Sequence, residues 1–401
     1  MQVITENKVV PKLRFEEFEM EWVKVLLKNC TLKIGSGLTP KGGNKVYQKV
    51  GIPFIRSQNV IDNKLVLSDN IFISDEINSK MKGSIVKPND ILLNITGGSI
   101  GRSCVVPLEF VKGNVNQHVC IIRLDNEHTP YFIQPFLASQ RGQKLIQQGQ
   151  TGSGREGLNF QSIASFKLHL PSLPEQQKIA SFLSAVDKKL QQLTKKKELL
   201  EEYKKGVMQK IFFQELRFKD DNGNNYPDWE EKRIEDLFIV TRGTVLAIPK
   251  ISPHKNDECP YPVFSSQTKN NGIAGYYKDY LFEDAITWTT DGAQAGEVNL
   301  RKGKFYCTNV CGVLKSDEGY ANLCIAEKLN RVSRRYVSYV GNPKLMNNVM
   351  AKIKISIPSS LDEHQKIADF LSSLDSKIEL VSTQIDNNNV FKKGLLQQMF
   401  V

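Results

Sequence analysis

Two stretches of the chain carry apolar residues at steps of three and four, the spacing of an amphipathic helix. They cover residues 175–212 and 363–400. The positions that we expect to pack in these two helices are Ile179, Leu183, Val186, Leu190, Leu193, Ile367, Leu371, Leu374, Ile378 and Val381. The stripes continue through Tyr203 and Phe391. A narrow stripe on a polar helix is typical of a coiled-coil seam with one partner helix. Helices buried on all sides fit poorly, because the polar faces are too continuous.

The two helical stretches are copies of one sequence. Residues 175–184 read EQQKIASFLS and residues 363–372 read EHQKIADFLS, and the offset of 188 holds to the end of the chain. This period is far longer than the roughly 20–50 residues of solenoid repeats. It therefore indicates a duplicated unit of one domain followed by one helix. If both helices start from equivalent domains, they are expected to pack as an antiparallel pair with pseudo-twofold symmetry.

The regions before each helix contain short apolar runs bounded by Gly, Asn and Pro, as β-strands do. The runs lie at 51–60, 89–98, 118–124, 260–272, 283–296 and 309–317. They correspond weakly between the copies, with Thr96 matching Thr290 and Val119-Cys120 matching Val310-Cys311. We predict an α+β protein of two β-rich domains separated by two long helices. The predicted segments are a domain at 1–170, a helix at 171–213, a domain at 214–358 and a helix at 359–401.

The net charge of the chain indicates what kind of partner it binds, and its composition indicates in which cellular compartment it works. The formal net charge is +11, and residues 1–170 contribute 21 Lys and Arg against 14 Asp and Glu. Such an excess favours a polyanion such as nucleic acid. The N-terminus lacks the apolar core of a secretory signal, and no apolar run is long enough to span a membrane. Seven scattered cysteines suit reduced thiols, so we expect a cytoplasmic protein without membrane association.

We find no motif for catalysis or for a metal. The chain has no P-loop and no Asn- or Asp-Pro-Pro-aromatic tetrapeptide of the kind that holds a flipped base. Cys307 and Cys311 form one loose pair, whereas zinc sites usually show two, so we expect buried structural thiols. His118 is similarly expected to be a core or loop histidine. We predict no catalytic residue, no metal ligand and no cofactor bound by this chain, which makes a nuclease or methyltransferase the least favoured class.

Polar loops after the predicted strands suit binding instead. Arg, Gln and Asn side chains match the major-groove edges of guanine and adenine, and Gly-rich turns with a cation suit phosphate. The candidate DNA-binding residues of the first domain are Arg56, Ser57, Gln58, Asn59, Thr96, Gly97, Gly98, Arg102 and Arg155. Those of the second domain are Ser266, Gln267, Lys269, Asn270, Thr290 and Asp291. For any one residue a solvated turn is the simpler interpretation, so the hypothesis depends on the recurrence of such loops in both domains.

At these positions the chain resembles the specificity subunits of type I restriction-modification systems. The resemblance depends on Leu170-Pro171 followed by Glu175-Gln176 through Asp187, and on the second copy from Glu363. It also depends on weaker motifs at 37–40, 51–56 and 90–92. The second domain departs from the pattern, because it is shorter and less basic and because residues 241–244 lack the Pro found at position 40.

The resemblance implies a non-catalytic subunit with two target recognition domains on an antiparallel coiled coil. Each domain would read one half of a split, asymmetric site in double-stranded DNA, and the helices would set the gap. The helices would also dock two methyltransferase (modification) subunits, to which restriction-motor subunits add. S-adenosylmethionine, ATP and Mg would bind to those partners. The leading alternative is a protein-binding scaffold with two related domains and no DNA contact.

Overall fold

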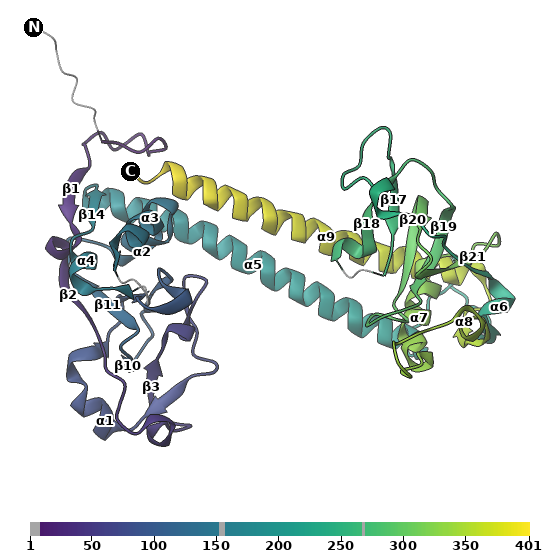
Figure 1. The fold of residues 1–401 in the computed structure, drawn as a ribbon, viewed down its shortest axis with the longest axis horizontal. Coiled ribbons are helices and arrows are strands. Elements are labelled where there is room, and N and C mark those ends of the chain that lie inside the picture. Colours follow the sequence, from purple (N-terminus) through teal and green to yellow (C-terminus); the bar gives the residue numbers. More distant parts are fainter. Residues whose placement is uncertain (1–8, 152–156, 267–268) are drawn as a thin grey trace, which may run out of the picture. The chain divides into compact units, whose positions relative to one another are not determined.

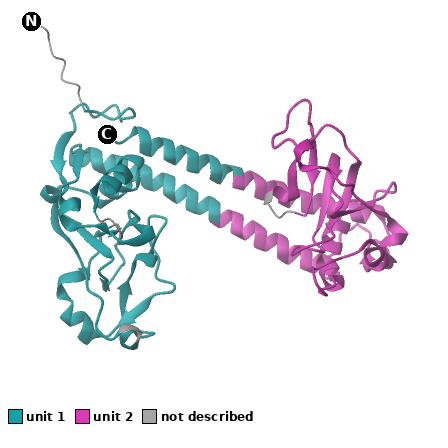
Figure 2. Ribbon diagram, viewed as in Figure 1, with its two compact units in different colours: residues 1–194, 383–401 teal, residues 195–382 magenta. Residues whose placement is uncertain are grey.

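The computed structural model describes residues 9–151, 157–266 and 269–401. Its contacts divide the chain into two compact units (Figure 2), which are residues 1–194 with 383–401 and residues 195–382. The division points, after Thr194 and after Ser382, are separated by the same 188 residues as the sequence repeat. Each unit therefore consists of one β-rich domain and half of each long helix.

The two long helices are α5, Leu173–Phe212, and α9, Leu361–Gln398 (Figure 1). Both begin two residues earlier than the apolar pattern indicates. In α5 the first turn contains Pro174, whose missing N–H removes no hydrogen bond, because the first N–H groups of a helix have no partner within it. The α+β class is confirmed, with a long helix following each β-rich domain.

The helices run antiparallel where they meet in each unit. In the first unit Lys392 Nζ of α9 lies 2.5 Å from Asp187 Oδ1 of α5. In the second unit Lys204 Nζ of α5 lies 2.7 Å from Asp375 Oδ1 of α9. In the same unit Lys197 Nζ lies 3.1 Å from Ser382 Oγ, so residue numbers rise along α5 while those of its partners in α9 fall. Both ion pairs use the same two positions of the repeat, because 188 residues separate Asp187 from Asp375 and Lys204 from Lys392.

The predicted packing stripe is largely buried. Eight of its ten residues are buried, and the other two, Leu190 and Ile378, are half-buried and equivalent in the repeat. The extension of the stripe to Tyr203 and Phe391 is wrong, because these side chains are 53% and 52% exposed. The next positions of the stripe, Val207 and Leu395, are buried again, so these two aromatic residues interrupt the buried row and do not end it.

The first unit contains two four-stranded sheets. One has the order β2 (Thr31–Ser36), β11 (Val119–Leu124), β8 (Ile91–Asn94), β9 (Ser103–Val105). The other has the order β6 (Ile71–Ile73), β3 (Ile52–Ile55), β10 (Gly113–Val115), β7 (Ile85–Val86), with β3 and β10 parallel. Three antiparallel pairs accompany them: β1 (Val23–Leu26) with β14 (Lys167–Leu170), β4 (Val60–Ile61) with β5 (Lys64–Leu65), and β12 (Gln150–Thr151) with β13 (Gly157–Leu158).

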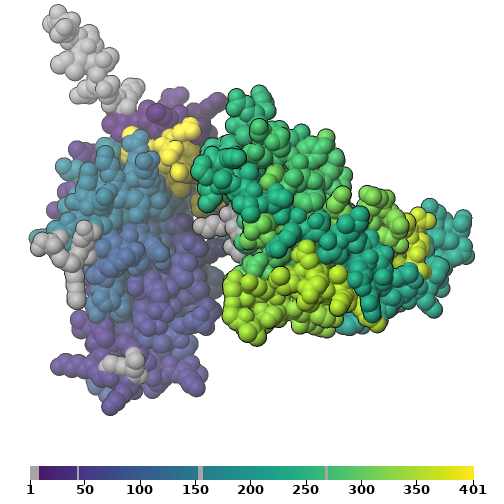
Figure 3. Space-filling model, turned by 45° about the vertical axis from the view of Figure 1, so that its right-hand side comes forward, coloured from purple at the N-terminus to yellow at the C-terminus, as the bar shows by residue number. Residues whose placement is uncertain are grey.

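Alternation along β11 divides the core of this unit into two parts. Ile121 points into a core between the two sheets, whereas Cys120 and Ile122 point into a core shared with the helices. These helices are α2 (Pro130–Ala138), α3 (Gln140–Gly149) and α4 (Phe160–Ala164), while the short α1 (Asp75–Lys80) packs on the second sheet. The C-terminal end of α9, yellow beside the purple N-terminal residues in Figure 3, contributes Leu395 to the core of the first unit, and Phe400, just after the helix, joins the same core.

The second unit contains one six-stranded sheet. Its order is β16 (Ile239–Arg242), β21 (Cys311–Lys315), β19 (Phe282–Thr289), β20 (Val298–Cys307), β17 (Tyr261–Phe264), β18 (Ile273–Tyr277). A separate antiparallel pair joins β15 (Glu230–Arg233) to β22 (Lys354–Ile357). The core that contains Trp288 is covered by α6 (Ile234–Leu237), α7 (Leu323–Ser333) and α8 (Asn347–Lys352).

Two glycines show that the domains share one framework. A Cβ on Gly37 would lie 1.7 Å from the carbonyl oxygen of Val115, and a Cβ on Gly243 would lie 2.0 Å from that of Cys307. No side chain fits such a gap, so both positions require glycine. Val115 and Cys307 also occupy the same place, because each ends the strand that pairs in parallel with β3 or β17.

This framework corrects the internal alignment by one residue. Val119 pairs with Asn94 and Cys311 pairs with Thr289, so Val119 corresponds to Cys311 and not to Val310. Thr96 therefore corresponds to Asp291 and not to Thr290. A shift of one residue exchanges the two faces of a strand, and the short apolar runs are too alike to define the register without their pairing partners.

Candidate nucleic-acid interface

Four segments of the first unit meet where strands β2, β3, β8 and β10 end. The Gly37 N–H donates to Asn116 O at 3.2 Å, and the Asn116 N–H donates to Ile55 O at 3.1 Å. The Ile95 N–H donates to His118 O at 3.0 Å. We call the residues that follow these strands, namely 37–39, 56–58, 96–99 and 116–118, the strand-end surface of the first unit. Its backbone is held from several strands at once, so its side chains have a rigid base.

A chain of side-chain hydrogen bonds crosses this surface. The Thr39 hydroxyl donates to Gln117 Oε1. Gln117 Nε2 lies 3.1 Å from His118 Nε2, and His118 Nδ1 lies 2.6 Å from Thr96 Oγ1. The Gln117 side chain is exposed. The chain thus fixes an exposed carboxamide in one orientation.

The structure brings most of the predicted residues of the first domain to this surface. The segment of Arg56, Ser57 and Gln58 is joined to β8 through Asn94 Nδ2, which donates to Ser57 O at 2.8 Å. Residues 96–98 follow Asn94 in the loop after β8. Arg102 is exposed at the end of the same loop, where its N–H donates to Ser99 O at 3.1 Å.

Two predicted residues of the first domain need separate comment. Asn59 is only 3% exposed, and its amide accepts from the Arg56 N–H and donates to Val66 O, both at 2.9 Å. Because these bonds use the amide within the fold, Asn59 holds the turn, and its assignment to DNA binding stays a prediction that its burial disfavours. Arg155 lies outside the described residues. Gly157, two residues further along the chain, forms an isolated β-bridge with Thr96.

The second unit repeats the backbone arrangement with other side chains. The Thr308 N–H donates to Phe264 O and the Thr290 N–H donates to Val310 O, both at 3.0 Å. The Thr308 hydroxyl donates to Ser265 Oγ at 3.1 Å. Residues 243–244, 265–266, 290–292 and 308–310 therefore form the strand-end surface of the second unit, and Ser266 and Asp291 belong to it.

The remaining predicted residues of the second domain differ in accessibility. Thr290 is 1% exposed, and its hydroxyl donates to Asp291 Oδ2 at 2.6 Å, which disfavours a contact with DNA; its assignment to DNA binding stays a prediction. Asp291 is also 3.7 Å from Lys344 Nζ. Asn270 is exposed in a turn with a left-handed φ of 51°. Gln267 and the side chain of Lys269 lie outside the described part of the chain.

Sequence reasoning missed the central turn of each surface, at 116–118 and 308–310. His118 was assigned to a core or loop role and Gln117 was not considered. The available signal was the polar run directly before the apolar strand β11. Its bond to Thr39, 78 residues away in the chain, is visible only in the tertiary structure.

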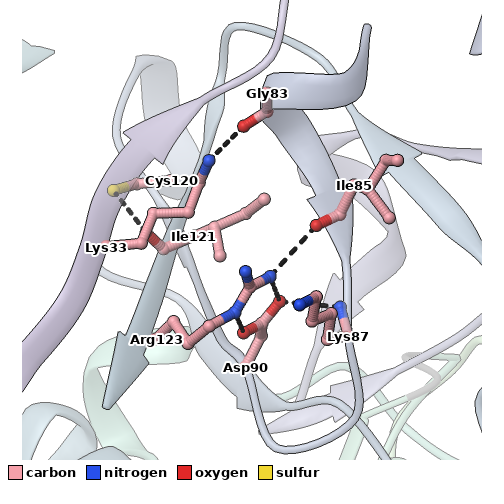
Figure 4. A network of polar contacts seen from close by, with 8 residues as sticks. All are labelled: Lys33, Gly83, Ile85, Lys87, Asp90, Cys120, Ile121 and Arg123. Carbon is pink, nitrogen blue, oxygen red and sulfur yellow. Dashed lines mark hydrogen bonds and ion pairs between the residues drawn. The ribbon is translucent and has the colours of Figure 1, made fainter. Parts of the chain in front are cut away.

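A buried ion pair at the start of β8 holds the strands in place (Figure 4). Arg123 of β11 donates from Nε and Nη2 to the two carboxylate oxygens of Asp90 at 2.7 and 2.8 Å. Nη2 also donates to Ile85 O at 3.1 Å, and the Lys87 N–H donates to Asp90 Oδ2 at 2.7 Å. The network joins β7, β8 and β11, and the strand-end surface follows the other end of β8.

The described residues contain no group of three or more His, Cys, Asp or Glu side chains placed to hold a metal ion. Cys307 and Cys311 are both buried. Within the same residues, no helix is long and apolar enough to cross a membrane.

Two β-rich domains with polar strand-end surfaces, each followed by one of two antiparallel helices, define a two-domain recognition protein. The sequence matches the family described as type I restriction modification DNA specificity domain, over residues 21–202 and again over 226–388. The chain therefore belongs to this family, in two copies. Members are the non-catalytic DNA-recognition subunits of restriction-modification complexes, and the methylase subunits are separate chains.

Individual relatives agree with this assignment. A Mycoplasma pneumoniae protein described as a type I specificity subunit is 31% identical over 221 residues, which are 53% of this chain and 82% of that protein. A Methanocaldococcus jannaschii protein described as the MjaX specificity subunit is 24% identical over 411 residues, 96% of this chain and 94% of that one. The crystal structure of an S subunit from M. genitalium has the same fold, with a TM-score of 0.66, 15% identity and coverage of 98% and 99%.

Proposed function

We propose that the two strand-end surfaces each read one half of a split, asymmetric site in double-stranded DNA. The observation that carries the proposal is the contrast between framework and side chains. Gly37 and Gly243 occupy the same close contact in the two domains, yet the turns beside them read Asn-Gln-His at 116–118 and Thr-Asn-Val at 308–310. A shared framework with different exposed side chains suits two readers of different base sequences.

The first surface also has groups that suit a phosphate. Arg56 is half-buried in the turn after β3, and its guanidinium carries a positive charge that favours an anionic oxygen. Arg102 is exposed at the edge of the same surface. Phosphate contacts give affinity that depends on salt, and side chains at base edges give the choice of sequence.

The long helices have two equivalent exposed aromatic residues, which suit two identical partners. Tyr203 and Phe391 are 188 residues apart, are about half exposed, and each precedes a pair of lysines in the sequence. Exposed aromatic side chains are typical anchors of protein interfaces. We propose that each anchors one methyltransferase subunit, to which restriction-motor subunits add. In this proposal S-adenosylmethionine, ATP and Mg bind to these partners, and the complex works in the cytoplasm.

The decisive experiment exchanges one reader. Residues 13–170 are replaced by the corresponding segment of another specificity subunit, and the methylated motif is read from the DNA of a host that also carries the modification subunits. We expect one half-site to change and the other to persist. A change in both halves, or in neither, would overturn the two-reader proposal.

The alternative of a scaffold without DNA contact makes a different prediction. If the assembled complex binds duplex DNA through about 6–10 phosphate contacts, raising the salt from about 50 to 200 mM lowers its affinity by roughly 10³–10⁵-fold. A complex that assembles but shows no affinity for DNA at low salt would favour the scaffold.

A further inference from the structure

We infer that one carboxamide at the tip of each central turn, Gln117 in the first unit and Asn309 in the second, reads an adenine in its half-site. The inference deepens the proposed function and depends on it. Gln117 and Asn309 are equivalent, because each lies two residues before the first residue of its strand, Val119 or Cys311. Both side chains are exposed. The strand-end surfaces differ in most other side chains but retain a carboxamide at this place.

After its hydrogen bonds within the protein, the Gln117 carboxamide still has one donor and one acceptor, which together match adenine. A carboxamide has two acceptor lone pairs and two N–H donors. Oε1 accepts one bond from Thr39, and Nε2 is bonded to His118. One acceptor site and one N–H therefore remain. The major-groove edge of adenine presents an N6–H donor and an N7 acceptor, and glutamine and asparagine recognise it with two hydrogen bonds.

The Gln117 Nε2 group can only donate, so its contact with His118 Nε2 requires a ring nitrogen that accepts. In the neutral tautomer with the proton on Nδ1, Nδ1 donates to Thr96 Oγ1 and Nε2 accepts from Gln117. Thr39 and His118 are thus positioning residues for Gln117. A side chain that is already held loses less rotamer freedom on binding than a free one. Guanine, which presents two acceptors, would leave Oε1 without a donor.

The turn that presents Asn309 is also braced, but by a different side chain. Arg242 Nη2 donates to Asn309 O at 2.8 Å, and the Thr244 N–H donates to Cys307 O at 3.1 Å. The shorter Asn side chain therefore extends from a backbone that is held by a hydrogen bond to its own carbonyl oxygen. This supports the same type of contact in the second half-site.

The test uses the full chain with its modification subunits in a host, and reads base preferences from the methylated motif. Gln117→Ala is expected to reduce the preference for adenine at one position of the first half-site by on the order of 10- to 100-fold, and to leave the second half-site unchanged. Asn309→Ala is expected to do the converse. The control is Asn126→Ala, an exposed carboxamide beyond the other end of β11, which should change neither half-site.

Two further variants separate reading from folding. Gln117→Glu replaces the remaining donor by an acceptor and should move the preference at that position from adenine to cytosine, whose N4 donates. Thr39→Val should weaken the preference for adenine without replacing it. Unchanged preferences at every A·T position in Gln117→Ala and Gln117→Glu would overturn this inference alone. A wild-type chain whose motif is not split would overturn the proposed function instead.

Discussion

Arg217 Nη2 lies 2.8 Å from Glu363 Oε2, and this carboxylate is completely buried at the start of α9. Its repeat is the pair of Arg14 and Glu175 at the start of α5, where Nε and Nη2 each donate at 2.8 Å. The bond to the carboxylate raises the pKa of each guanidinium above its ordinary value, although burial opposes this. In each unit the ion pair joins the segment that precedes the β-rich domain to the first turn of the long helix that follows this domain.

The buried carboxylates of the two pairs differ in one donor, which predicts unequal costs of removing their arginines. Trp22 Nε1 also donates to Glu175 at 3.1 Å, whereas Trp229 Nε1 is buried without a partner among the described residues. Arg217→Met should therefore destabilise its unit more than Arg14→Met, and each loss should be of the order of 3–5 kcal/mol. Urea unfolding followed by hydrogen exchange measures each unit separately. Equal losses, or a larger loss at Arg14, would contradict the role of Trp22.

His364 predicts a loss of stability in mild acid. Burial lowers the pKa of His364 below 6.5, against the hydrogen bond to Pro358 O and the charges of Glu363 and Glu230. Because the unfolded chain binds a proton more readily than the folded one, this part of the stability is complete above about pH 6.5 and falls as the pH drops toward the folded pKa.

The first copy of the repeat supplies the matched substitution. Gln176 occupies the equivalent position, and its Nε2 donates to Pro171 O at 3.0 Å as His364 Nε2 donates to Pro358 O at 2.8 Å. His364→Gln should therefore fold normally and flatten the decline in thermal midpoint between pH 7 and pH 5. The exposed His254→Gln is the control. A decline as steep as in the wild type would exclude His364 as its source.

Helix length is predicted to set the gap between the half-sites. Seven residues inserted after Thr194 and after Ser382, the equivalent division points of the two units, add about 10.5 Å of helix. At about 3.4 Å per base pair this corresponds to a gap wider by roughly three base pairs. The methylated motif gives the measurement, and both half-sites should stay unchanged. An insertion in one helix only, which breaks the antiparallel register, should abolish modification.

Removal of the exposed aromatic residues should release partners one at a time. Tyr203→Ser and Phe391→Ser are each expected to lower the number of bound methyltransferase subunits from two to one, and the double variant to none. Native mass spectrometry of the co-expressed complex counts them. Leu380→Ser is the control, because Leu380 is an exposed apolar residue on α9 whose repeat position, Gln192, is polar. Loss of both subunits in a single variant would contradict two independent anchors.

Predictions from local pattern succeeded, and those that needed contacts distant in sequence did not. The helices follow from spacing along one segment, and Ile179 and Ile367 are buried as expected. The strand runs were found, but their register was off by one, since only pairing across the sheet distinguishes Val310 from Cys311. Asn59 and Thr290 were assigned to DNA by residue type, whereas burial uses their polar groups within the fold.

The duplication, the two helices and the β-rich character of both domains can all be read from the order of residues, because periodicity and repetition are properties of neighbouring residues. Tertiary structure decided which side chains remain available. Tyr203 is half exposed although Val207, four residues further along the same helix, is buried. Gln117 is a held, exposed carboxamide because the Thr39 hydroxyl, in the loop after β2, donates to it. Exposure and hydrogen-bond partners depend on what the rest of the chain places beside a residue, and no local pattern contains that information.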